Sequence, residues 1–291
     1  MKKLLFILLM LTVGFSALAQ ESGSEKTTKN RPFFVGVSYS YMSVDMKLAD
    51  MSLHSVWYGS DLGTYDLTED EIDNLNDQFD RSSEINAILA EFGWWILKKP
   101  ETKWQVNAKL FGGIAQSFSN ITNKSGESQE ITYNSGFSKP CLGLGAGVGY
   151  RFTDRWGLNL NPVLVGTMGK SDDITDKTHP DPVNFQSVKE HKYKTMVGRI
   201  DLLVSFHTGP VNIYAGPGLY RVWSWHDYTR TYSEGDPGEV ITEEMTTRIA
   251  TGSWLNAVAG ASWEITSSFT IFAKAGLGTD LSVDGGIHFN F

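Results

Sequence analysis

The chain has 291 residues, of which 41% are apolar and 20% charged, and it carries 33 acidic against 25 basic side chains. This composition excludes a disordered chain and fits either two soluble domains or one large β-barrel. The single cysteine, Cys141, excludes a disulfide scaffold, no Cys/His cluster has structural-zinc spacing, and a net charge of -8 argues against nucleic acid as a partner.

Residues 1–19 have the pattern of a secretory signal peptide. Two lysines precede a short apolar run, and the sequence Ala-Leu-Ala precedes a predicted cut after Ala19. Residues 20–31 are rich in Ser, Thr, Glu and Lys, and we expect them to be a flexible segment. Residues 32–291 contain no run of 18 apolar residues, so a membrane crossing would have to be made by strands.

From residue 33 onward, apolar residues alternate with polar or small ones, as in the strands of membrane barrels. In the clearest case, residues 142–152, apolar side chains take every second position and four glycines and Arg151 take the others. Ten segments show this alternation: 33–41, 88–96, 104–114, 142–152, 156–164, 196–206, 211–219, 255–264, 270–277 and 283–291. The sequence therefore predicts one all-β, antiparallel transmembrane barrel of about ten strands over residues 32–291.

The connections between these segments differ in length. Those after the second, fourth, sixth and eighth segments are short, whereas those after the first, third, fifth and seventh are long and polar. Short turns on one side and long loops on the other are typical of outer-membrane barrels, and an even strand number places both ends of the barrel on the periplasmic side.

Two prolines interrupt the alternation. Pro162 and Pro217 lie inside predicted strands, where proline usually marks a bulge or an edge. Arg221 falls on the lipid-facing parity. We therefore expect either a bulge near Pro217 or a strand that has already left the bilayer there.

In these features the chain resembles the small, porin-like outer-membrane β-barrel proteins of diderm bacteria. The resemblance rests on the signal peptide, the alternating strands, the loop asymmetry and an apolar C-terminus, and it covers residues 32–291. It implies an outer-membrane location, contacts with lipid and lipopolysaccharide, and an insertion signal for the barrel-assembly machinery at Ile287, Phe289 and Phe291. It does not select a function, because this superfamily includes channels, adhesins, enzymes and structural proteins.

Charged residues at inward positions are predicted to pair inside the barrel. The predicted lumen network is Glu91, Lys109, Arg151, Arg199, Asp201 and Lys274. A turn centred on Pro100 would place Glu91 directly opposite Lys109, and a turn at 208–209 would place Arg199 and Asp201 opposite two glycines. Because unpaired buried charge is costly, we expect these groups to plug the lumen; a narrow pore of mixed charge is the alternative.

The first long loop, residues 45–84, contains eleven acidic and two basic residues. Thr68 followed by Glu71 forms a capping box, which predicts a short extracellular helix over residues 68–81. Its apolar face, made by Ile72, Leu75 and Phe79, is expected to rest on the barrel rim or to enter the barrel mouth. A possible cation-binding group lies in the same loop: Asp66, Asp70, Asp73 and Asp77. Solvated surface charge is the alternative, because the loop lacks the spacing of a calcium-binding loop.

The sequence points to no catalytic residues, cofactor or resident metal. It contains no G-x-S-x-G or H-E-x-x-H motif, and it has neither the Asp-x-Asp nor the Asp-x-His spacing that a resemblance to the omptin proteases would bring. Ser205 and His207 share the inward face near a short turn, which leaves an outer-membrane hydrolase as the weakest alternative. The leading hypothesis is a monomeric, non-enzymatic porin-like or structural barrel; an interaction or adhesion module that uses its acidic loops comes second.

Overall fold

The computed structural model describes residues 32–57, 60–98, 102–125, 130–171, 173–176, 187–233, 240–251, 255–278 and 280–291. The predicted signal peptide and the segment that follows it lie outside these residues. Among the described residues, no helix is long and apolar enough to cross a membrane.

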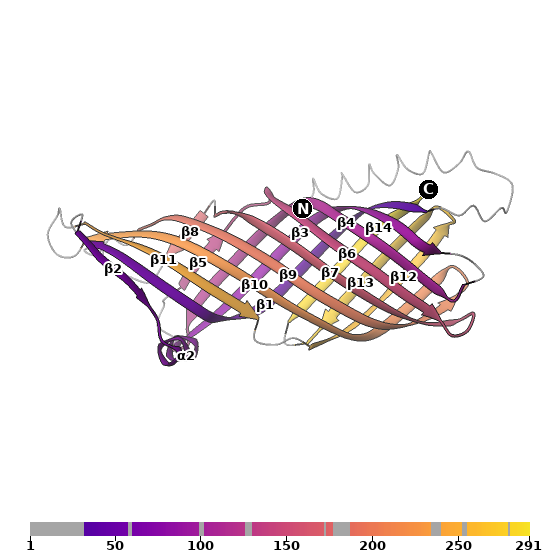
Figure 1. The fold of residues 1–291 in the computed structure, drawn as a ribbon, viewed down its shortest axis with the longest axis horizontal. Coiled ribbons are helices and arrows are strands. Elements are labelled where there is room, and N and C mark those ends of the chain that lie inside the picture. Colours follow the sequence, from indigo (N-terminus) through magenta and orange to yellow (C-terminus); the bar gives the residue numbers. More distant parts are fainter. Residues whose placement is uncertain are drawn as a thin grey trace. The chain divides into compact units, whose positions relative to one another are not determined.

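The described residues form fourteen antiparallel strands and one helix (Figure 1). The strands are β1 Phe33–Trp57, β2 Ser60–Asp66, β3 Phe79–Lys98, β4 Trp104–Asn123, β5 Glu130–Asn134, β6 Lys139–Arg151, β7 Trp156–Lys170, β8 Asp173–Asp176, β9 Ser187–Thr208, β10 Val211–Ser233, β11 Val240–Thr251, β12 Leu255–Thr266, β13 Phe269–Leu277 and β14 Leu281–Asn290. The helix is α2, Glu69–Gln78.

Ten of the strands close into a ring, as the alternation predicts. Following the hydrogen-bonded neighbours, the order is β1, β3, β4, β6, β7, β9, β10, β12, β13, β14 and back to β1. The closing pair runs from Phe34 opposite Asn290 to Ser43 opposite Leu281, and Phe33 and Phe291 exchange backbone hydrogen bonds. The ring has a short-turn end, where tight turns such as the one at Gly209 (φ +58°) join neighbouring strands.

At the opposite end, which we call the long-strand end, much of the predicted loop is β-structure instead. β9 and β10 stay paired as far as Ser187 and Thr231, and β11 fills the space between β10 and the far half of β1. β2 pairs with β1, and β5 joins β4 to β8. Figure 1 shows β2, β5, β8, β11 and α2 gathered toward this end.

The predicted bulge near Pro217 is wrong. The β9–β10 ladder has no pairing at Gly216 and Pro217 but keeps the same register before and after them, and Pro217 faces Ala257 regularly on its other side. Because proline lacks the N–H of one ladder bond, the strand omits that bond without gaining a residue. Arg221 lies just beyond Leu219, the last strongly exposed apolar residue of β10, and its guanidinium lies 5.7 Å from the Trp223 ring.

The helix forms where the capping box predicts it, but it is shorter. The backbone N–H of Glu71 donates to Thr68 Oγ1, and the Thr68 N–H donates to the Glu71 carboxylate. The helix ends at Gln78, and Phe79, which was predicted to lie on its apolar face, begins β3 instead. Ladder pairing with Asn123 of β4 explains this early end.

Candidate functional site

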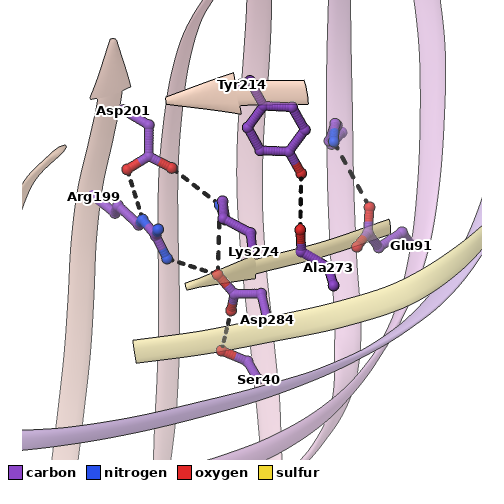
Figure 2. Close-up of polar contacts among 9 residues, drawn as sticks. Ser40, Glu91, Arg199, Asp201, Tyr214, Ala273, Lys274 and Asp284 are labelled. Carbon is purple, nitrogen blue, oxygen red and sulfur yellow. Dashed lines mark hydrogen bonds and ion pairs between the residues drawn. The ribbon is translucent and has the colours of Figure 1, made fainter. Parts of the chain in front are cut away.

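Four charged side chains from β9, β13 and β14 form a ring of ion pairs in the lumen (Figure 2). Arg199 Nε lies 2.8 Å from Asp201 Oδ1, and Arg199 Nη1 lies 2.7 Å from Asp284 Oδ2. Lys274 Nζ lies 3.0 Å from Asp201 and 3.4 Å from Asp284, to which Ser40 also donates. Asp201 is 1% exposed. Because removing a charge from water is costly, each charge in this group needs the direct contact with an opposite charge that it has here. We call these four residues the ion-pair ring.

A second group of charged side chains lies closer to the short-turn end than the ion-pair ring does. Glu91 of β3 is 6% exposed, and its Oε2 lies 3.8 Å from Lys109 Nζ and 3.1 Å from His288 Nε2. The Lys109 ammonium also lies 5.5 Å from the centre of the Phe34 ring. Across the two groups, three carboxylates thus face three Lys or Arg side chains.

The structure brings together five of the six residues predicted for the lumen network and leaves Arg151 apart, exposed at the short-turn end. The predicted pairing needs correction: Glu91 faces Phe111, Lys109 faces Gly93, and Arg199 faces Tyr220. The ladder runs two residues out of the predicted register, with an irregularity near Trp95, so the long side chains of Glu91 and Lys109 meet diagonally. Asp284 and His288, also on inward positions of the alternation, complete the two groups.

A cavity of about 430 Å³ lies beside these charges. One part of its wall is apolar and comes from the contiguous strands β3, β4, β6 and β7: Ala87, Leu89, Phe111, Cys141, Val163 and Val165. The ion-pair ring occupies the other side of the barrel, on β9, β13 and β14. The lining also includes Arg151 and Glu264, which are exposed at the short-turn end, so the cavity meets solvent there.

Beyond the ion-pair ring, toward the long-strand end, lies a buried apolar cluster. Its members are Met42, Val44, Met46, Leu48, Ile85, Tyr220, Val222 and Ile249. Ile72 and Leu75 of α2 pack against it, which places the apolar face of the helix where the sequence predicts. We refer to these eight residues as the apolar cluster.

One side chain of helix α2 forms the two hydrogen bonds to the backbone of β1 that a neighbouring strand would form. The Leu48 N–H donates to Asn76 Oδ1 at 2.8 Å, and Asn76 Nδ2 donates to the Leu48 carbonyl at 2.9 Å. The β1–β3 ladder ends at Met46, so the Asn76 amide satisfies the next backbone groups of β1 in place of β3. The helix therefore takes the place of β3 beside β1 beyond the end of the β1–β3 ladder.

A cluster of buried rings lies farther toward the long-strand end. A hydrogen bond of 2.7 Å joins His191 Nε2 to His226 Nδ1, and the rings lie 5.0 Å apart at an interplanar angle of 4°. Tyr228 stacks on His191 at 4.6 Å, and Tyr133 lies 4.3 Å from it. Burial lowers the pKa of His226 to about 4, and burial together with the neighbouring His226 lowers the pKa of His191 to about 2. The alternation in the sequence does not predict this cluster, because its four residues lie outside the ten alternating segments, in predicted loops.

The predicted cation-binding aspartates do not converge. Asp66 lies on β2 and Asp70, Asp73 and Asp77 lie on α2, all exposed. Within the described ranges, no three His, Cys, Asp or Glu side chains are arranged to hold a metal ion. In the described residues these four aspartates are exposed side chains on two separate elements.

The two residues considered for hydrolysis are not arranged as a nucleophile and its base. Ser205 is 1% exposed, and its Oγ accepts a hydrogen bond from Asn159 Nδ2 at 3.0 Å. His207 lies two residues farther along β9, and among the contacts of the described residues none joins it to Ser205. Nucleophilic catalysis requires such a contact.

The predicted insertion signal lies on the outer side of β14. Ile287 faces Val37 and Phe289 faces Val35 across the closing pair. Phe291 is 51% exposed, and its ring lies 6.2 Å from that of Phe33.

No protein-family model matches the sequence, and no curated protein matches it. Among solved structures, the transport unit of the autotransporter AIDA-I from Escherichia coli is similar at 10% identity, with 92% of this chain and 93% of that chain covered and a TM-score of 0.42. The translocator domain of the autotransporter NalP from Neisseria meningitidis is 10% identical over 97% and 95% of the two chains, with a TM-score of 0.39. The outer membrane protein OprG from Pseudomonas aeruginosa is 9% identical over 89% and 96%, with a TM-score of 0.32. Similarity at this level assigns no activity to the chain.

Proposed function

We propose that this chain is an integral outer-membrane β-barrel, porin-like in architecture and without enzymatic activity, whose lumen is closed to ions in the conformation described above. The observation that carries the proposal is an outward band of exposed apolar side chains to which each of the ten ring strands contributes. Leu142 is 70% exposed, and Leu110 and Leu277 are 62% exposed. In water each fully exposed leucine would forgo about 1.5–3 kcal/mol of burial energy, and soluble monomers rarely expose large contiguous apolar patches.

Aromatic residues at the border of this band support the same proposal. Trp94, Trp104, Trp156 and Trp263 are 47–51% exposed and lie near the short-turn end of their strands. Tryptophan prefers the interface between hydrocarbon and water, because its ring is apolar and its N–H can reach a polar partner. This arrangement supports a bilayer with the short-turn end at one interface.

The closed lumen is supported by the order of its contents. A path entering at the short-turn end meets the two charged groups, which compensate each other, and then the apolar cluster, where Val44 is 1% and Val222 0% exposed. Ions would have to cross that apolar layer without water, which is strongly unfavourable. In contrast to the charged plug that the sequence suggests, we infer that the barrier is mainly apolar.

Planar-bilayer recording of the refolded protein tests this proposal. We expect no stable single-channel steps from the wild type, and salt-dependent steps from a variant that combines Met46→Ala, Leu48→Ala and Val222→Ala. A matched control, Leu110→Ala with Leu142→Ala, removes the same kind of side chain from the outer face and should stay silent. Steady channels in the wild type would refute the closed lumen, and a mature chain that stays soluble without detergent would refute the membrane location.

We extend the proposal to assembly. The outward positions of Ile287, Phe289 and Phe291 on the closing strand support their use as an insertion signal for barrel-assembly machinery. The same location would bring the long-strand end among lipopolysaccharide molecules and leave the barrel as a monomer. These partners follow from the proposed location.

A further inference from the structure

We propose that the lumen cavity is a binding site for a small uncharged molecule that has an apolar body and one hydrogen-bonding oxygen, and that this molecule enters from the short-turn end. The volume of about 430 Å³ lies within the range of small-molecule sites, roughly 300–1,000 Å³. The proposal goes beyond the function proposed above and uses the closed lumen only to set the side of entry.

The lining of the cavity is apolar on one side and charged on the other. A lumen that held only water would favour polar walls, but Leu89, Phe111 and Val165 face this cavity as part of one buried apolar group. The lone cysteine, Cys141, belongs to the same wall and is 3% exposed. Such a wall favours a ligand with an apolar body.

Two residues on the lining each carry a buried polar atom that lacks a hydrogen-bond partner among the described residues. The Arg199 side chain is 10% exposed; its Nε and Nη1 bind carboxylates, but Nη2 has no hydrogen-bond partner among the described residues. Asn107 is 9% exposed, lies over Gly147, and has an Oδ1 that likewise lacks a partner in the described part of the chain. Both atoms are buried, so a ligand hydroxyl would reach either one after a shift of the neighbouring side chains and would then supply its missing partner.

The charged side chains beside the cavity already balance one another. The ion-pair ring and the Glu91–Lys109 pair contain three carboxylates and three cations, all in contact with opposite charge. An anionic ligand would add an uncompensated charge beside Asp201 and Asp284, and a cation would face Arg199 and Lys274. A neutral oxygen satisfies Arg199 Nη2 without either cost, so the site should select uncharged molecules.

A ligand can enter the cavity from one end of the barrel. The cavity lining reaches exposed residues at the short-turn end, whereas the apolar cluster lies across its other end. A ligand therefore comes and goes on one side. The cavity serves as a pocket and not as a passage.

Cys141 supplies the test, because it is the single thiol of the chain and lies in the apolar wall. The full-length mature protein in lipid nanodiscs is treated with the small neutral reagent methyl methanethiosulfonate, and modification is followed by mass spectrometry. Benzyl alcohol should slow the modification saturably, by at least fivefold, whereas benzoate at the same concentrations should not. Equal protection by both probes, or by neither, would overturn the proposal. A Cys141 that never reacts in the folded protein, even at pH 10 where a reachable thiol ionises enough to react, would overturn it as well.

Two variants separate occupancy of the cavity from an effect of benzyl alcohol on the lipid. Val165→Trp fills the cavity, so Cys141 should react slowly from the start and benzyl alcohol should add no protection. Leu164→Trp places the same ring on the neighbouring residue, which does not line the cavity, and should behave as the wild type does. If both variants respond alike, the protection does not come from the lumen. Single-channel recording is independent of this readout: channels in the wild type would refute the closed lumen, and absent protection in a silent barrel would refute only the ligand site.

Discussion

The His191–His226 pair should make the long-strand end of the barrel sensitive to acid. Both side chains are buried, with 2% of each exposed, and their rings are joined by one hydrogen bond within a layer of tyrosines. Because the folded pKa values lie below the ordinary 6.5, an opened segment binds protons that the closed one does not. The stabilisation is fully present above about pH 6.5 and is lost as the pH falls toward about 4 for His226 and about 2 for His191.

The size of the effect follows from the pKa difference. At pH 5 the ordinary imidazole is mostly protonated and the buried one is not, so each histidine contributes about 2 kcal/mol in favour of opening, at 1.36 kcal/mol per pH unit below 6.5. This corresponds to a loss of about 30-fold in the closing equilibrium for one histidine.

Hydrogen exchange with mass spectrometry measures this locally. We compare protection factors, corrected for the intrinsic rate at each pH, between pH 7.5 and pH 5. Residues 187–195 of β9 and 224–231 of β10 should lose at least about 30-fold in protection. Residues 199–208 and 211–219 of the same strands should not change, because they lie in the ring within the apolar band.

Variants decide whether the histidines are the cause. Replacing both, His191→Phe with His226→Phe, keeps aromatic rings in the stack and should remove the pH dependence. His54→Phe alters a more exposed histidine near Asp61 and should leave the dependence intact. Unchanged protection in the wild type at pH 5, or an equal loss in the double variant, would refute the reasoning.

Three further changes test other parts of the structure. Asp201→Asn leaves two buried cations with less compensation and should destabilise the barrel by about 3–5 kcal/mol in urea unfolding in lipid vesicles, whereas the exposed Asp66→Asn should have no effect. Thr68→Ala removes the helix cap and should destabilise α2 by about 1 kcal/mol, seen as faster limited proteolysis of that segment; an unchanged cleavage rate would contradict the role of the capping box. Phe291→Ala should slow assembly into membranes, measured by heat-modifiable gel mobility, more than Leu281→Ala at the other end of β14.

The sequence predicts the ring well because the outward positions of its strands carry apolar side chains, which can be recognised from residue type alone. Residues 142–152 place Leu, Val and Phe on one face and glycine on the other, and period two converts that order directly into a strand. Register is a different matter, since it depends on a turn and on an irregularity near Trp95. A shift of two residues leaves every side chain on its predicted face, which is why Glu91 and Lys109 meet in the lumen although they do not face each other.

The extension beyond the ring escaped prediction because its polarity is inverted. In β9 the outward positions carry apolar residues from Met196 to Phe206, but the preceding outward positions are Lys192 and Lys194, which are exposed. The inward positions between them hold the buried residues His191, Tyr193 and Thr195. The alternation with a period of two continues without a break. Here, however, the apolar side chains point inward and the polar ones outward, as in a strand of a soluble protein. Contacts that depend on several distant strands, such as the histidine pair, cannot be read from this pattern.

This inversion explains how the lumen is filled along its length. Behind the apolar band on β9, β13 and β14, the inner face is polar. Arg199, Asp201, Lys274 and Asp284 can be held there only as a compensated set, because a narrow lumen supplies too little water. Where water surrounds the wall, apolar side chains move inward and pack as in a soluble core, as Val222 does at 0% exposure. The apolar cluster therefore forms just beyond the apolar band. The apolar cluster inside the barrel and the end of the apolar band outside it therefore follow from one alternation of side chains, whose polarity reverses along the strands.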